Sequence, residues 1–174
     1  MMRVRFFGFK FGDPREFVER PALWWGSPKE EVFLNESDSY ISTVIKKDGQ
    51  RLTLEAVVQR VFFLEEFYEK FSSFEGIAVY VFPDAKDLID QSLEDYRVFQ
   101  ACLENKEGVQ GVIHLYNSWH NPKDGFVLGK SAVEKKVGVK PLIETCLGQR
   151  DDVDQKGSFL KLIEYIKNEY KGRV

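Results

Sequence analysis

Two segments in the first third of the chain alternate hydrophobic and polar residues, which predicts β-strands. The first runs from residue 3 to residue 11, with a change of parity at Gly8 that is typical of a β-bulge. The second is the β-branched run 38–47, which the Asp48-Gly49 turn signal closes. Residues 14–37 contain three prolines and one glycine, so the pattern gives them no assignment.

A long helix is predicted over about 54–74, with Thr53 as its N-cap. On a helical wheel the polar residues, Glu66 and Glu69 among them, gather on one side. The remaining apolar arc is wider than one helix–helix contact needs, so this helix is expected to be buried against two neighbours. Phe62 is the exception, because the wheel places it within the polar face.

The second half of the chain continues the alternation of strands and helices. The apolar run 76–82 has no polar residue, which is typical of a strand covered on both faces. Asp84 is expected to cap the helix that follows. The other predicted elements are a helix near 85–105, a strand over 109–116, a loop over 117–126, a short helix over 140–147 and a final helix near 158–170.

This order of elements predicts a single α/β or α+β domain with a mixed sheet of about four to five strands. The βαβαβ order over residues 39–116 favours a partly parallel sheet, although antiparallel connections would give the same order. The length of 174 residues suits one domain. Charged residues make up 30% of the chain and nearly balance, which excludes wholesale disorder.

The charge and cysteine content narrow the class of protein. There are 25 lysines and arginines against 28 acidic residues, and the pI is near 5.6, which argues against a nucleic-acid binder. Two cysteines are too few for a disulfide framework. Charges at Arg3, Arg5 and Lys10 interrupt any signal-peptide core, and no stretch is long enough to span a membrane. We therefore expect a cytoplasmic protein without membrane association.

Motifs for catalysis and cofactor binding are missing from the sequence. It contains no glycine-rich phosphate loop, no Cys-x-x-Cys pair, no His-Glu-x-x-His, no EF-hand loop and no Gly-x-Ser-x-Gly elbow. We therefore predict no metal and no cofactor, and the sequence favours a protein that is not an enzyme.

Two kinds of residue remain as candidates for function, one for acid–base chemistry and one for partner binding. His114 and His120, the only histidines, flank the end of a predicted strand, and Asp84 follows another strand. An imidazole and a carboxylate at strand ends can perform acid–base chemistry, but a structural role explains each of them as well. The candidates for partner binding are aromatic or acidic: Trp24, Trp25, Phe62, Glu66, Glu69, Trp119, Asp151, Asp152 and Asp154.

The leading hypothesis from the sequence is a non-catalytic acidic binding protein. It would neutralise or regulate another protein, and a partner with a basic surface would suit its acidic groups, in the manner of immunity proteins or phage-encoded inhibitors. The alternative is a small α/β enzyme or ligand-binding protein that acts on a small molecule or nucleotide. In that case His114, His120 and Asp84 would share a pocket at the strand ends.

Overall fold

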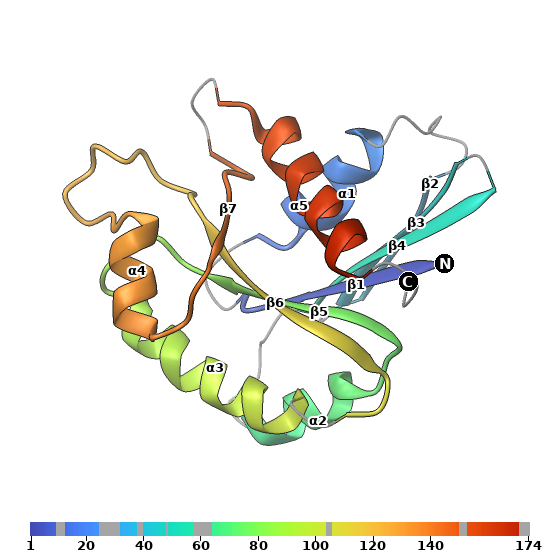
Figure 1. Ribbon diagram of the computed structural model, residues 1–174, viewed down its shortest axis with the longest axis horizontal. Coiled ribbons are helices and arrows are strands. Elements are labelled where there is room, and N and C mark those ends of the chain that lie inside the picture. The colour runs from blue at the N-terminus through green and yellow to red at the C-terminus, as the bar shows by residue number, and fades with distance from the viewer. Residues whose placement is uncertain are drawn as a thin grey trace.

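One mixed sheet runs through the computed structural model, with helices on both faces (Figure 1). The structure describes residues 1–9, 13–24, 32–37, 40–47, 49–57, 64–103, 106–149 and 153–170. Within these residues the sheet has seven strands: β1 Met2–Phe7, β2 Val32–Ser37, β3 Tyr40–Lys47, β4 Gln50–Val57, β5 Gly76–Phe82, β6 Val109–Asn117 and β7 Ile143–Thr145. The helices there are α1 Arg15–Trp24, α2 Leu64–Ser72, α3 Ile89–Leu103, α4 Lys130–Val137 and α5 Gln155–Glu169.

The strand order β2-β3-β4-β1-β5-β6-β7 places β1 near the centre of the sheet. β4, β1, β5, β6 and β7 are parallel to one another, while β3 is antiparallel to β4 and β2 to β3. From β1 the chain first builds the β4 side of the sheet and then crosses to β5 on the other side. The carboxyl ends of β1 and β5 therefore form a topological switch point, the place where open α/β sheets bind ligands.

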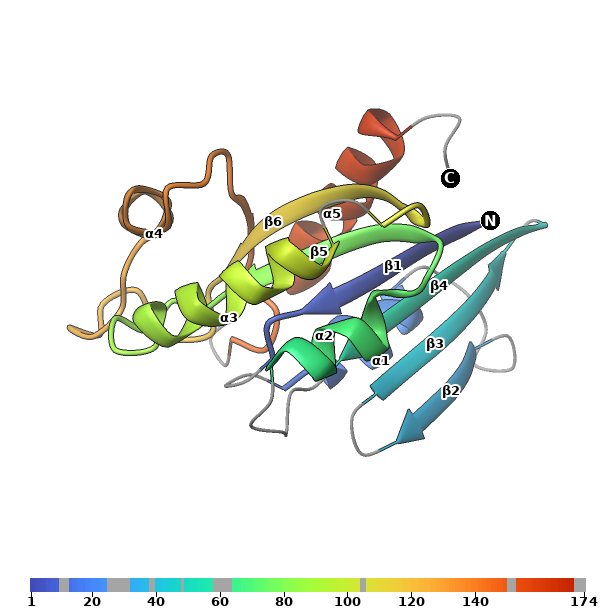
Figure 2. The ribbon, with the colours of Figure 1, turned by 90° about the horizontal axis from the view of Figure 1, so that it is seen from below.

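The sheet separates two hydrophobic cores. α1 and α5 cover one face, and α2 and α3 cover the other (Figures 1 and 2). Neighbouring residues of β1 point to opposite cores, so that Phe6 packs with α1 and Phe7 packs with α2 and α3. Every residue of β5 is buried. The α/β class, the partly parallel sheet and a strand covered on both faces over 76–82 are therefore confirmed.

The predicted long helix over 54–74 is wrong, and so is the count of four to five strands. Residues 50–57 form β4, which pairs with β1 on one side and with β3 on the other, and among the described residues of the predicted helix those of α2 are helical. Leu54 and Val57 belong to different cores. The run 52–56 alternates apolar and polar residues, as a strand does, but it is short, and the apolar residues after it extend the pattern into a wide helical arc. Thr53, the expected cap, pairs with Val44 and Arg3 inside the sheet.

Smaller corrections concern the ends of the elements. β1 stops at Phe7, α3 begins at Ile89 rather than near 85, and α5 begins at Gln155. The short helix predicted over 140–147 is wrong, because β7 lies there and the helix α4 precedes it. The unassigned segment 14–37 contains α1 and β2. Among the described helices, none has the length and apolar character needed to cross a membrane.

Candidate functional site

A cavity of about 210 Å³ lies at the carboxyl ends of β1, β5 and β6, at the switch point of the sheet. Its lining comes from four parts of the chain that are distant in sequence. Asp13 and Glu16 follow β1, Asp84 follows β5, His120 follows β6, and Asp95 lies on α3. The strand order brings these segments together, because parallel strands direct the loops at their carboxyl ends to one edge of the sheet.

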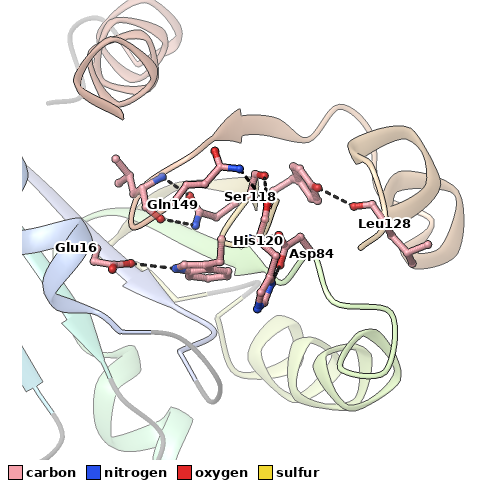
Figure 3. A network of polar contacts seen from close by, with 10 residues as sticks. Glu16, Asp84, Ser118, His120, Leu128 and Gln149 are labelled. Atoms are coloured by element: carbon pink, nitrogen blue, oxygen red, sulfur yellow. Dashed lines mark hydrogen bonds and ion pairs between the residues drawn. The ribbon is translucent and has the colours of Figure 1, made fainter. Parts of the chain in front are cut away.

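Asp84 and His120 form a tightly held pair at this cavity (Figure 3). The Asp84 carboxylate is 0% exposed, and its Oδ1 lies 2.8 Å from His120 Nδ1. Its Oδ2 accepts a second hydrogen bond, of 2.8 Å, from the backbone N–H of His120. A carboxylate can only accept, so Nδ1 must carry a proton. In the neutral imidazole this arrangement leaves Nε2 as an acceptor. Asp84 therefore orients the imidazole. The sequence had suggested that it caps α3, and that expectation is wrong.

A second layer of contacts fixes the loop that carries His120. The Gln149 side chain donates to the His120 carbonyl at 2.9 Å, and the Ser118 hydroxyl bonds the same oxygen at 3.4 Å (Figure 3). The buried Asn117 side chain bonds the backbone N–H and carbonyl of Leu147, which ties the end of β6 to the turn after β7. Satisfied buried amides of this kind hold a loop in one conformation.

Glu16 on α1 closes the opposite side of the cavity. Its carboxylate accepts a 3.0 Å hydrogen bond from Trp119 Nε1 (Figure 3). Burial raises the pKa of Glu16, and the nearby Asp13 charge raises it further, although the Trp119 bond opposes the shift. Gly148 packs against the same carboxylate with a φ of +79°, and a Cβ atom there would overlap Glu16. Glu16 is therefore held between Trp119 and Gly148.

A buried carboxylate, Asp95, is held by two tyrosines, one of which lines the cavity with it. Its Oδ2 accepts hydrogen bonds from the hydroxyls of Tyr68 at 2.5 Å and Tyr80 at 2.6 Å. Burial, with the Asp95 charge as a further cause, raises the pKa of both tyrosines well above the ordinary value, so they remain proton donors. Asp95 thus links α2, β5 and α3 at the cavity.

The lining of the cavity is acidic, unlike that of a phosphate-binding site. It contains the carboxylates of Asp13, Glu16, Asp84 and Asp95, and none of its described residues is a lysine or an arginine. A phosphate loop in this topology would lie between β1 and α1. Counted from Gly8, the signature Gly-x₄-Gly-Lys-Ser/Thr meets Asp13, Pro14 and Arg15 at its last three positions. Proline and arginine therefore stand where a phosphate loop has its phosphate-binding lysine and its hydroxyl residue.

The structure brings together some of the candidates from the sequence and separates others. Asp84, His120 and Trp119 line the cavity. His114 is outside that lining: it faces α3, and its Nε2 lies 2.8 Å from the Tyr96 hydroxyl. Burial lowers the pKa of His114, which suits a structural imidazole that stays neutral.

The described candidates for partner binding other than Trp119 belong to helices on both faces of the sheet (Figure 1). Trp24 is half-buried against Phe159, and Asp154 caps α5 by accepting from Gly157 N at 2.7 Å. Glu66 and Glu69 are exposed on α2. Trp25, Phe62, Asp151 and Asp152 lie outside the described residues.

Sequence reasoning missed Glu16, Asp95, Tyr80 and Gln149. Glu16 belonged to a segment without an assignment, and Asp95 occupied an ordinary position of a predicted helix. One signal was available in the sequence, because Asp95 lies on the same helical face as Tyr96 and Phe99, where an apolar residue would be expected. No protein-family model matches the chain, and no curated protein matches it.

Proposed function

We propose that this chain is a binding protein that accepts a positively charged group in the switch-point cavity. The observation that carries the proposal is the convergence of four carboxylates on that cavity, in a lining whose described residues include no lysine or arginine. Such a site repels phosphate and carboxylate ligands and favours an ammonium or guanidinium group. This supports a cation-binding version of the acidic binding protein expected from the sequence.

The hydrogen bonds around the cavity fix its carboxylates in place, which favours ligand binding. Each of three carboxylates accepts a hydrogen bond from a nearby ring side chain: Asp84 from His120, Glu16 from Trp119 and Asp95 from Tyr80. Their oxygens are therefore oriented before a ligand arrives. Preorganised groups lose little entropy on binding, which improves affinity for a small ligand. The Trp119 indole can also contact a cation through its ring face.

Butylammonium and butyl phosphate are suitable probes, because they share an alkyl chain and differ in charge. A ligand that binds only the folded protein raises the melting temperature as its concentration rises. We expect butylammonium to raise it and to change the Trp fluorescence, and we expect butyl phosphate to do neither. Asp84→Asn should reduce the butylammonium effect, while Glu66→Gln, an exposed control on α2, should not. Stabilisation by butyl phosphate alone would contradict the proposal.

A second candidate function, proton transfer by His120, rests on the Asp84 pair. The bond of 2.8 Å to Nδ1 selects the tautomer in which Nε2 can accept a proton, as a general base requires. A panel of hydrolysable esters, amides and phosphoesters tests this role. Turnover should disappear in His120→Gln and persist in His114→Gln, which alters the histidine outside the cavity. Absence of turnover by the unaltered protein across the panel would contradict this candidate.

A further inference from the structure

A wider hollow of about 580 Å³ adjoins the acidic cavity on the outer side of His120. The two hollows share Leu88 and His120 in their linings, so they are neighbours on one surface. The outer hollow contains two lysines, Lys86 and Lys136, and two aspartates, and Lys136 pairs with Asp90 at 3.1 Å. The balanced charge of the outer hollow contrasts with the acidic inner cavity.

Phe126 forms an exposed apolar anchor at this outer hollow. Its side chain is among the exposed large hydrophobic residues, at 47%, and its ring lies edge-on to the His120 ring with centroids 5.0 Å apart. Backbone hydrogen bonds from Lys86 N to its carbonyl, at 2.9 Å, and from Leu128 N to Asp84 O, at 2.8 Å, fasten this segment to the end of β5. An exposed aromatic ring on a fixed backbone has the properties of an interface anchor.

We infer that the two hollows together bind a segment of a partner polypeptide, with a lysine or arginine side chain in the acidic cavity and a neighbouring apolar residue on Phe126. The inference rests on the proposed cation binding. A free amine fills only the inner cavity, whereas a polypeptide continues past His120 into the outer hollow. The balanced lysines and aspartates there can accept a neutral peptide backbone, while the inner carboxylates disfavour a nucleic-acid backbone.

The peptide acetyl-Ala-Leu-Lys-Leu-Ala-amide tests the inference beside butylammonium. The peptide should bind about tenfold more tightly than butylammonium, as expected for one well-packed anchor contact. Phe126→Ala should weaken peptide binding about tenfold and change butylammonium binding much less, because Phe126 does not line the inner cavity. Tyr165→Ala is the matched control, because Tyr165 is an exposed aromatic residue of α5, outside the lining of both hollows. It should change neither affinity.

Two outcomes separate this inference from the proposed function. If butylammonium binds but the peptide is no tighter, or Phe126→Ala leaves peptide affinity unchanged, the polypeptide partner is wrong and the cation site stands. If neither probe binds, both proposals fail. A peptide with norleucine in place of lysine tests the role of charge, and binding as tight as the lysine peptide would overturn the inference.

Discussion

Two buried carboxylates of this protein, Glu55 and Asp84, have different kinds of partner. Glu55 on β4 is 3% exposed and pairs with Arg5 at 2.8 Å and Arg3 at 3.3 Å, both on β1. The Arg5 guanidinium also lies 4.4 Å from the centre of the Phe74 ring and bonds the Phe71 carbonyl at the end of α2. The permanent cations of arginine tie Glu55 to the architecture of the sheet.

Asp84 is buried as deeply, but its partner is an imidazole whose side chain is 42% exposed at the edge of a cavity. Histidine can change its charge near neutral pH, and arginine cannot. Burial of a carboxylate therefore does not by itself mark a functional site. The partner, and whether that partner reaches an open space, distinguishes the two.

The largest effect is expected from Glu55→Gln. It removes the negative charge and leaves Arg5 buried, which should lower the free energy of unfolding by about 3–5 kcal/mol. Denaturant unfolding measures the loss, and Glu66→Gln is the control, because exposed Glu66 should change stability by less than about 0.5 kcal/mol. Equal stabilities of the two variants would show that the Arg5–Glu55 pair does not support the sheet.

Asp84→Asn should have a smaller effect on stability and a specific effect on His120. The amide can accept only one of the two N–H bonds well, so we expect a loss of about 2–3 kcal/mol in the free energy of unfolding. Nitrogen NMR of the imidazole should show the Nδ1–H tautomer in the unaltered protein and a mixture in Asp84→Asn. An unchanged ring spectrum would mean that Asp84 does not orient His120.

Gly148→Ala tests whether Glu16 is fixed at the cavity. The Cβ atom would overlap the Glu16 carboxylate at a φ of +79°, and we expect a loss of about 2 kcal/mol. Gly49 has a φ of +74° with open space around it, so Gly49→Ala measures the cost of the backbone conformation alone. Gly148→Ala should cost more than Gly49→Ala, and Glu16→Ala should remove the excess. If it does not, the side chain of Glu16 does not pack against Gly148.

The fold could be predicted in class but not in detail. The run 76–82 and the Asp48-Gly49 pair carried clear signals: β5 covers this run, and β3 and β4 pair antiparallel as far as Lys47 and Gln50, on either side of that pair. The error over 54–57 arose because residues 52–57 are all buried and their alternation, with Leu52, Leu54 and Ala56 apolar and Thr53 and Glu55 polar, is too short to exclude a helix. The position of a strand in the sheet, which determines this burial, depends on pairing partners far away in sequence.

The candidate site was predictable only in part for a related reason. His120 and Asp84 follow strands, and their positions at the carboxyl ends suggested a shared pocket. Glu16 and Asp95 enter the cavity from helices, and no local pattern shows that their helices approach it. The sequence also could not distinguish the two histidines, because both stand near the end of the same strand, and only the sheet shows that His114 faces α3.

The weakest effect should be the contribution of His114 to the pH dependence of stability. Burial lowers the pKa of His114 below its ordinary value of 6.5, so below that pH the unfolded chain binds more protons than the folded protein. His114 therefore contributes stability that is present above pH 6.5 and is lost as the pH falls, and His114→Gln should make the decline between pH 7 and 5 less steep. An NMR titration of the imidazole measures the shift directly.

Tyr96→Phe is the control, because burial is the cause of the shift, and removing the hydroxyl at 2.8 Å should leave the pKa of His114 low. A pKa that returned to 6.5 in Tyr96→Phe would show that the hydrogen bond, and not burial, keeps this histidine neutral.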